Sequence, residues 1–378
     1  MSVLLTGASG FLGCRLLREL LARGEKVTVL GRGTPHELRT RVEAAVQWLA
    51  TPLLDAHAMA AVRYVSGDLV QPGLGLDPQE RARITEGLTT LWHCAALVVL
   101  EGDPAPLHHA NVIGTRHVLE LADDAPGARL LYVSTAYVAG KRSTGHIMED
   151  DLQDTSGFQI PYEESNYTAE RMVHAWAAGG HRDATVFRPS LLVTDRPAPQ
   201  GLPGQPTDVL LRLMHQIMGN GPDAGAALPT QLHAPRPSAA SLRYRMQGDP
   251  LGSLNMLQAD YAAHAMVLAA SQTAPAAGVR TMHVTHPHNV TFQTVAEALE
   301  TRFPGLEVSM TPTLHRPTPL EKLAADFAAN PLAYSTHRRT YDRTNLLGAV
   351  GTLPDPDLVD HAYLSRAFGR TPASAAAG

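Results

Sequence analysis

Three glycines near the start of the sequence have a spacing that suits a phosphate-binding turn. Gly7, Gly10 and Gly13 follow an apolar run at 2–6 and precede leucines that recur at helical spacing. Glycines at such a junction allow a tight turn and a close approach of the backbone to a pyrophosphate, which the positive end of the helix stabilises. The segment predicts a dinucleotide site, and a purely structural turn is the alternative. The candidate contact residues are Thr6, Gly7, Ser9, Gly10, Phe11, Leu12 and Gly13.

An arginine follows the second apolar run, at 26–30. In a dinucleotide-binding unit this place usually holds an acid that meets the ribose hydroxyls of NAD. Arg32 carries the opposite charge and favours the 2′-phosphate of NADP, with Arg39 or Arg41 as further donors. We therefore expect NADP(H) as the cofactor, and a solvated surface arginine is the alternative reading of Arg32.

Alternating strand-like and helix-like patterns must position these residues. Such alternation predicts an α/β fold of the Rossmann type, a doubly wound parallel sheet with a smaller C-terminal substrate-binding region. A helix-like stretch at 260–270 and a strand-like run at 281–285 are expected to rejoin the sheet. The strands expected in the first half lie at 2–6, 26–30, 62–65, 91–94, 129–134 and 184–188.

The texture of the sequence changes after Pro189, where stretches rich in Pro and Gly replace the regular alternation. These stretches suit loops and a mobile lid over a substrate pocket. We expect an NADP-binding Rossmann domain at 1–190, a mainly substrate-binding or lid region at 191–258, a return to the Rossmann core at 259–290, a C-terminal substrate-side region at 291–370 and a disordered tail at 371–378.

Several short motifs, taken in their order along the chain, resemble the extended short-chain dehydrogenase/reductase family. Besides the glycines they are SGDL at 66–69, HCAA at 93–96 and NVIGT at 111–115. The resemblance covers most of residues 1–300. It implies that Asp68 holds the adenine and that Asn111 braces the sheet near the active site, although both residue types are also common caps and turn formers. The cofactor contacts that it adds are Asp68, Leu69, Cys94, Ala95, Ala96, Thr135 and Pro189.

Two later segments are similar to the thioester-reductase branch of that family. STAYV at 134–138 places Thr135 at the position of the family's active-site Ser or Thr, although a β-branched strand residue is ordinary there. The run YEESNYTAER at 162–171 is similar to a Y-E-x-S-K-x-x-A-E-R pattern, with Asn166 in place of lysine. The resemblance implies that Tyr162 shares a proton with the carbonyl or alcohol and that Thr135 orients the substrate. Asn166 stands where a lysine would bind ribose and lower the tyrosine pKa.

Two other pairings of tyrosine with a basic residue compete with this assignment. Tyr167 with Arg171 would need a shifted register, in which the neighbouring Ser, Ala and Glu matches are lost. Tyr137 with Lys141 has the literal spacing but follows a strand and contains Gly140, whereas the pair must occupy successive turns of one helix. We therefore keep Tyr162 with Asn166.

The missing lysine bears on the direction of the reaction. Free tyrosine has a pKa of about 10, so Tyr162 should remain protonated near neutral pH and donate a proton more readily than accept one. This favours carbonyl reduction by NADPH over reactions that begin with alcohol oxidation. We predict a ketoreductase for a small aromatic polyketide-type ketone, with a degenerate catalytic set and assistance from the substrate. The alternatives are an acyl-thioester or aldehyde reductase and a non-catalytic NADP(H)-binding sensor.

Composition narrows the class of protein further. The formal net charge is −5 without a basic run, so the footprint of a nucleic-acid partner is missing, and no apolar stretch is long enough for a membrane span. Cys14 and Cys94 cannot form a disulfide framework and are expected to be buried free thiols. These features predict a cytoplasmic protein with a small-molecule substrate. The histidines lack ligand spacing, so we expect no metal.

Overall fold

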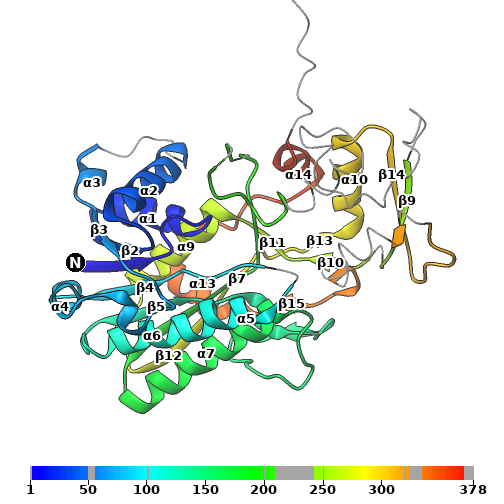
Figure 1. Cartoon of the computed structure of the whole chain (residues 1–378). Coiled ribbons are helices and arrows are strands. Elements are labelled where there is room, and N and C mark those ends of the chain that lie inside the picture. The colour runs from blue at the N-terminus through cyan, green and yellow to red at the C-terminus, as the bar shows by residue number, and fades with distance from the viewer. Residues whose placement is uncertain are drawn as a thin grey trace, which may run out of the picture.

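A seven-stranded parallel sheet forms the centre of the computed structural model (Figure 1). The strand order β12-β7-β5-β4-β1-β2-β3 runs outward from β1 in both directions, which is the doubly wound arrangement that the sequence predicts. The strands are β1 Ser2–Thr6, β2 Lys26–Gly31, β3 Arg63–Ser66, β4 Thr90–His93, β5 Arg129–Val133, β7 Asp183–Pro189 and β12 Gly278–Val284. The structure describes residues 2–49, 56–99, 102–196, 198–199, 201–208, 211, 214, 242–249, 251–318, 321–322 and 334–369.

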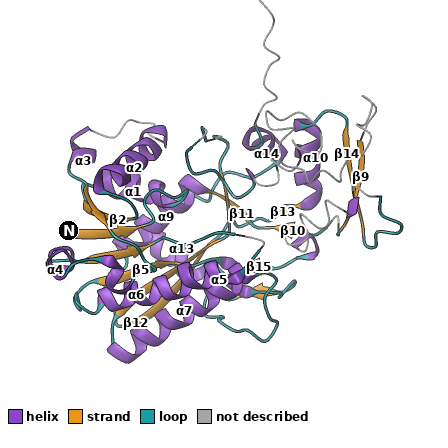
Figure 2. Ribbon diagram, in the orientation of Figure 1, coloured by secondary structure: helices purple, strands orange, loops and turns teal. Residues whose placement is uncertain are grey.

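Helices cover both faces of this sheet (Figure 2). On one face the leucines of the first helix, among them Leu16, Leu17 and Leu20, are buried in a cluster with strand and helix residues. Their helical spacing gives that helix one continuous apolar stripe. This face carries α1 Gly13–Ala22, α2 Pro35–Leu49, α9 Ala259–Gln272 and α13 Thr344–Val350, and the opposite face carries α4 Pro78–Thr85, α6 Gly114–Ala122 and α7 Pro161–Gly180.

A second, smaller core lies beside the carboxyl ends of the sheet strands and gathers residues that follow β7, apart from α9, β12 and α13, which belong to the sheet and its covering helices. Phe292, Leu299 and Tyr363 are buried within it. Its elements are β8 Leu191–Val193, β9 Leu242–Gln247, β10 Ser253–Leu254, β11 Met256–Gln258, β13 Val290–Thr291, α10 Phe292–Arg302, β14 Leu306–Thr311 and α14 His361–Ala367. Residues 215–241 of the expected lid region and the expected tail at 371–378 lie outside the described residues.

Short elements complete the connections between strands. A π-helical segment, η2, covers His108–Ile113 between a short helix and α6. The others are α3 Ala56–Ala60, η1 Pro72–Gly75, α5 Pro104–Leu107, η3 Ala136–Ala139, β6 His146–Ile147, η4 Tyr334–Thr336 and β15 Thr340–Tyr341. Among the described residues, no helix is both long and apolar enough to cross a membrane.

The C-terminal segment returns to the loop between β5 and α7. β15 pairs in parallel with β6, so Thr340 lies opposite His146. Arg339 donates from Nη1 to the carbonyl oxygens of Gly140 and Arg142, at 2.6 and 3.0 Å. These contacts bring the segment around β15 next to the loop that leads from β5 to α7.

Candidate active site

The glycine turn between β1 and α1 has no room for side chains. Gly7 has a φ of +78°, and a Cβ on it would lie 2.6 Å from the amide nitrogen of Ala95. A Cβ on Gly13 would lie only 1.9 Å from the carbonyl oxygen of Gly7. The turn therefore packs directly against the end of β4 and against the first turn of α1. This geometry suits the predicted pyrophosphate contact, which stays a prediction.

A chain of buried polar contacts links the ends of β1 and β4 to α6. Thr6 Oγ1 lies 2.9 Å from Nδ1 of His93, and His93 Nε2 lies 3.0 Å from Oγ1 of Thr115. Burial lowers the pKa of His93 to about 4, so the ring is neutral at physiological pH. The Ala95 amide also donates to Thr6 Oγ1, at 3.3 Å, which fixes the predicted cofactor turn at residues 94–96.

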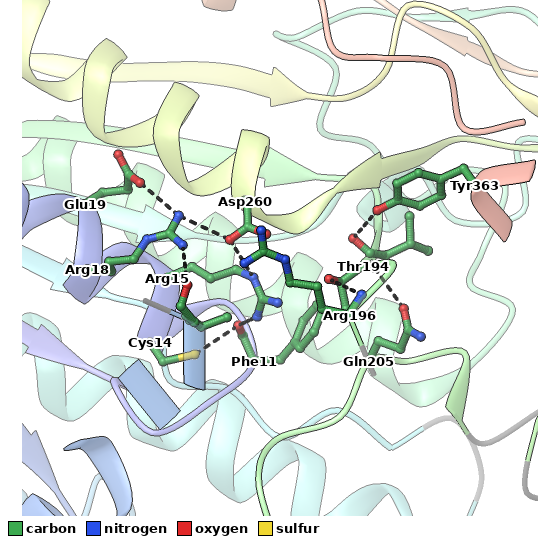
Figure 3. Close-up of polar contacts among 12 residues, drawn as sticks. Phe11, Cys14, Arg15, Arg18, Glu19, Thr194, Arg196, Gln205, Asp260 and Tyr363 are labelled. Carbon is green, nitrogen blue, oxygen red and sulfur yellow. Dashed lines mark hydrogen bonds and ion pairs between the residues drawn. The ribbon is translucent and has the colours of Figure 1, made fainter. Parts of the chain in front are cut away.

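Two arginines of α1, Arg15 and Arg18, form a polar cluster next to the glycine turn (Figure 3). The Arg15 side chain is fully buried, donates from Nη1 to the Phe11 carbonyl at 2.6 Å and lies 4.2 Å above the Phe11 ring. Its Nε lies 3.4 Å from Oδ1 of Asp260 on α9, and Arg18 reaches the same oxygen at 3.2 Å. Asp260 therefore links α9 to α1 and has a structural role.

The two cysteines differ in burial. Cys14 is buried as expected, whereas Cys94, which directly follows β4, is only half-buried.

The predicted ribose end of the site lies at the ends of β2 and β3. Arg32 is exposed directly after β2, and its carbonyl accepts a hydrogen bond from Nη2 of Arg41. Arg39 instead pairs with Glu43 at 2.8 Å, so Arg41 is the better placed of the two predicted helpers. Asp68 Oδ1 accepts from the Val70 amide at 3.2 Å, which orders the turn after β3. Leu69 follows in that turn, and its carbonyl accepts a hydrogen bond from the His117 ring at 2.7 Å.

The three residues predicted for catalysis come together at the carboxyl end of β5. Tyr162 and Asn166 stand one turn apart on α7, and the Asn166 amide donates to the Tyr162 carbonyl at 2.9 Å. Burial raises the pKa of the Tyr162 phenol to about 12, although hydrogen bonds with the side chains of Thr135 and Asn166 act in the opposite direction. The phenol is therefore a protonated donor at neutral pH, flanked by a hydroxyl and an amide.

A buried ion pair fixes the orientation of this part of α7. Both Arg188 on β7 and Glu170 on α7 are fully buried, and Arg188 Nη2 lies 2.6 Å from Glu170 Oε1. Burial alone would raise the pKa of Glu170, but the charge of Arg188 and hydrogen bonds hold it at about 2. Ser134 donates to Glu170 Oε2 at 2.5 Å. Ser134 thus serves the ion pair, while its neighbour Thr135 faces Tyr162.

Asn111 lies inside the π-helical segment and braces two parts of the site. Its Oδ1 accepts from the Leu97 amide at 2.7 Å, and its Nδ2 donates to Ser165 Oγ at 3.0 Å. Asn111 therefore joins the segment after β4 to α7, and the role that the family resemblance implies for it stays a prediction. Pro189 closes β7 on the same side of the sheet.

The competing pairings are not arranged for this chemistry. Tyr137 belongs to the 3-10 turn η3, and Gly140, with a φ of +59°, separates it from Lys141. Tyr167 stands one turn from Arg171, whose guanidinium carbon lies 5.8 Å from the Tyr167 ring centroid, but the Tyr167 ring is buried against Phe158, with ring centroids 5.0 Å apart. Asn255 has a structural role, since its Nδ2 donates to the His286 carbonyl oxygen and to Asn289 Oδ1.

Sequence reasoning missed the C-terminal contribution to the site. The Tyr334 hydroxyl donates to Oε1 of Glu163 at 2.6 Å, and Glu163 directly follows Tyr162. Tyr334 also meets the Tyr137 ring edge-on at 5.1 Å. No motif marks these contacts, because they join positions 171 and 197 residues apart in the sequence.

Comparison with known proteins places the chain among reductases. Residues 5–226 match the NAD-binding protein family described as Male sterility protein. The nonribosomal peptide synthetase asaC of Aspergillus flavus is 33% identical over 204 residues, which are 51% of this chain and 20% of that protein. The 2-alkyl-3-oxoalkanoate reductase of Stenotrophomonas maltophilia is 30% identical over 197 residues, 51% of each chain. The matched part of this chain therefore spans about half of the length of the second relative and a fifth of the first.

A solved structure shares the whole fold. The terminal R domain from the myxalamid PKS-NRPS biosynthetic pathway superimposes with a TM-score of 0.72 at 24% identity. The superposition covers 97% of this chain and 88% of that domain. The extended reductase fold thus continues through the C-terminal part of the chain.

Proposed function

The chain belongs to the NAD-binding family described as Male sterility protein, a family of nicotinamide-dependent reductases, and on that premise we propose that it is an NADPH-dependent ketoreductase. Its substrate is a small ketone of the aromatic polyketide type, reduced to the alcohol. The observation that carries the proposal is the Tyr162 phenol, whose pKa of about 12 keeps its proton in place, beside Thr135 and an uncharged Asn166.

Such a site suits hydride delivery to a carbonyl. The nicotinamide supplies the hydride when it is bound, and the residues of this chain hold the carbonyl near the Thr135 and Tyr162 hydroxyls. A general acid typically contributes about 10²–10⁴-fold to the rate, and a ketone that is hydrogen-bonded to its own neighbouring phenol needs less of that help. Thr135 and Asn166 carry no charge, and the Glu163 carboxyl raises the pKa of Tyr162 further. The reverse reaction, in which the phenol must first lose its proton, is therefore the weaker direction.

The expected preference for NADPH rests on two arginines near the end of β2. The Arg41 side chain donates to the Arg32 backbone carbonyl there, so both arginines lie at this end of the strand, and guanidinium groups suit a 2′-phosphate. Arg32→Ala should weaken NADPH binding at least tenfold and leave NADH binding within about twofold, because one charge-assisted hydrogen bond contributes about 1.5–3 kcal/mol. Arg39→Ala is the control, since Arg39 pairs with Glu43. Equal losses for both coenzymes would remove the case for NADPH.

An acyl-thioester reductase is the second candidate. It is favoured by the sequence match to a nonribosomal peptide synthetase. Stopped-flow loss of NADPH absorbance with a peri-hydroxy aromatic ketone, run in parallel with an acyl-CoA thioester, separates the two. Turnover of the ketone to the alcohol supports the proposal, and turnover of the thioester alone replaces it with the second candidate. Saturable NADPH binding without turnover of either compound would favour a non-catalytic sensor.

A further inference from the structure

One tyrosine of the C-terminal segment contacts both elements that carry the predicted catalytic hydroxyls. Tyr334, in η4, donates from its hydroxyl to Oε1 of Glu163 on α7, at 2.6 Å. Its ring also meets the Tyr137 ring in η3 edge-on, with centroids 5.1 Å apart and ring planes at 78°. Glu163 directly follows Tyr162, and Tyr137 stands two residues after Thr135. Tyr334 therefore joins the two short segments whose separation decides how the phenol meets the Thr135 hydroxyl.

The start of α7 depends on Glu163, because the residue before the helix cannot cap it. Ile160 occupies the N-cap position and has no polar side chain that could accept from the first helical amides. Glu163 Oε2 reaches back instead and accepts from the Gln159 amide at 2.6 Å. A carboxylate at the third helical position makes a similar contact in a capping box. This carboxylate thus joins the chain before α7 to its first turn, which contains Tyr162.

The other oxygen of the same carboxylate is held by a hydroxyl that keeps its proton. Burial and the nearby Glu163 charge raise the pKa of Tyr334 above its usual value, so this hydroxyl donates throughout the physiological pH range. Burial raises the pKa of Glu163 as well, and the hydrogen bonds from Tyr334 and Gln159 and the charge of Arg339 offset part of that rise. Both side chains are buried, so loss of the hydroxyl would leave a carboxylate oxygen without its donor, which is costly.

We propose that Tyr334 is a positioning residue for the reaction: its hydroxyl, acting through Glu163, fixes the first turn of α7 so that the Tyr162 phenol stays beside Thr135. The inference rests on the proposed function, because it concerns the proton donor of the same reduction. It also places a requirement of the reaction outside the part of the chain that matches the family, since that match ends at residue 226. Tyr334 acts in this role without touching the ketone or the coenzyme.

The first test asks whether the hydroxyl fixes the start of α7, and it needs no turnover. Tyr334→Phe removes the hydroxyl and keeps the ring that packs on Tyr137. Hydrogen exchange of the full chain should show amides at 158–166 exchanging at least about fivefold faster, with the glycine turn at 6–13 unchanged. Tyr244→Phe is the matched control, because Tyr244 is buried in the same smaller core but lies on β9. Unchanged exchange at 158–166 in Tyr334→Phe would overturn the proposal.

The second test asks whether the effect passes through Tyr162. With NADPH and 1-tetralone, a ketone without a phenol of its own, Tyr334→Phe should lower kcat about tenfold and leave KM within about twofold. The physical reason is that a displacement of about 1 Å can reduce a rate by on the order of a hundredfold. In the Tyr162→Phe background the same substitution should change kcat by less than about twofold. A merely structural effect would persist in that background, and such persistence would contradict the proposal.

A substrate that carries its own proton donor should be less sensitive to this substitution. In 8-hydroxy-1-tetralone the phenol is hydrogen-bonded to the ketone, so Tyr334→Phe should lower kcat by less than about threefold. Equal losses of kcat with the two tetralones would show that Tyr334 does not act on proton delivery.

Failure of this inference and failure of the proposed function give different results. If the wild-type protein reduces neither tetralone, the ketoreductase is contradicted, while hydrogen exchange still supports or overturns the contact that fixes α7. If the wild-type protein reduces them and Tyr334→Phe leaves kcat unchanged, the ketoreductase is supported and Tyr334 has no part in its mechanism.

Discussion

The two ends of the candidate active site are determined in different ways. At the coenzyme end, the close approach of backbone segments determines the geometry, because Gly7 and Gly13 leave no space for a Cβ. At the α7 end, side-chain chemistry decides, through the buried Glu170–Arg188 pair and the Tyr162 phenol beside Asn166. The comparison teaches that a buried ion pair elsewhere on α7 can keep Tyr162 in position, although the residue one turn after it, Asn166, is not a cation.

The largest effect is expected from removing the charge pair that fixes the α7 end. Arg188→Met should lower the free energy of unfolding by about 3–5 kcal/mol, because it leaves Glu170 buried and unpaired. Urea unfolding measures this change. Arg243→Met is the matched control, since its pair with Glu307 is exposed and should contribute less than about 1 kcal/mol. Equal effects of the two substitutions would show that the buried pair does not hold this end.

The next effect is expected at the coenzyme end. Gly13→Ala should weaken NADPH binding at least tenfold, because relieving a Cβ contact of 1.9 Å with the Gly7 carbonyl must displace the turn. Fluorescence titration of NADPH gives the affinity. Gly179→Ala serves as the control, because a Cβ on Gly179 meets nothing within 4 Å. Unchanged affinity in Gly13→Ala would mean that the coenzyme does not use this turn.

A smaller, pH-dependent effect is expected from placing a lysine at position 166, where the family pattern has one. In the wild-type protein, the Tyr162 pKa of about 12 should leave the rate of ketone reduction flat up to pH 10, since the donor keeps its proton. Asn166→Lys places an ammonium one turn away and lowers that pKa, so reduction should decline at alkaline pH while alcohol oxidation by NADP⁺ increases. Asn166→Met separates charge from size. Identical pH profiles for the Lys and Met variants would contradict this account.

The smallest effect is expected from the tyrosine itself. If the substrate supplies much of the proton transfer, Tyr162→Phe should reduce the rate with a peri-hydroxy ketone by less than about tenfold, below the usual 10²–10⁴-fold range for a general acid. The same variant assayed with a ketone lacking the neighbouring phenol should lose more. A drop beyond a hundredfold with both ketones would restore Tyr162 as an ordinary acid.

What the sequence predicts well are the features that depend on local pattern. The strand at 2–6, the glycine turn and the helix after it follow from periodicity and steric need, and the structure contains each of them. The family resemblance brings Thr135, Tyr162 and Asn166 together, as the hydrogen bonds to the phenol show. Their catalytic roles stay predictions.

What the sequence could not supply are contacts across long separations. Arg339 bonds Gly140 from 199 residues away, and no local pattern distinguishes it from the exposed Arg338. Cys94 looks apolar in its sequence context, yet it lies at a strand end that faces the site and is therefore only half-buried. Burial of a given side chain depends on which distant segment covers it, and periodicity contains no information about that segment.

The pairing of β15 with β6 has a consequence for biosynthesis. Chains emerge from the ribosome from the N-terminus at about 5–20 residues per second, and local units fold as they appear. The glycine turn and its neighbouring strands are then available long before β15, which pairs with β6 only when the last part of the chain has been made. A nascent chain would thus form its glycine turn first and close the contact between β6 and β15 last.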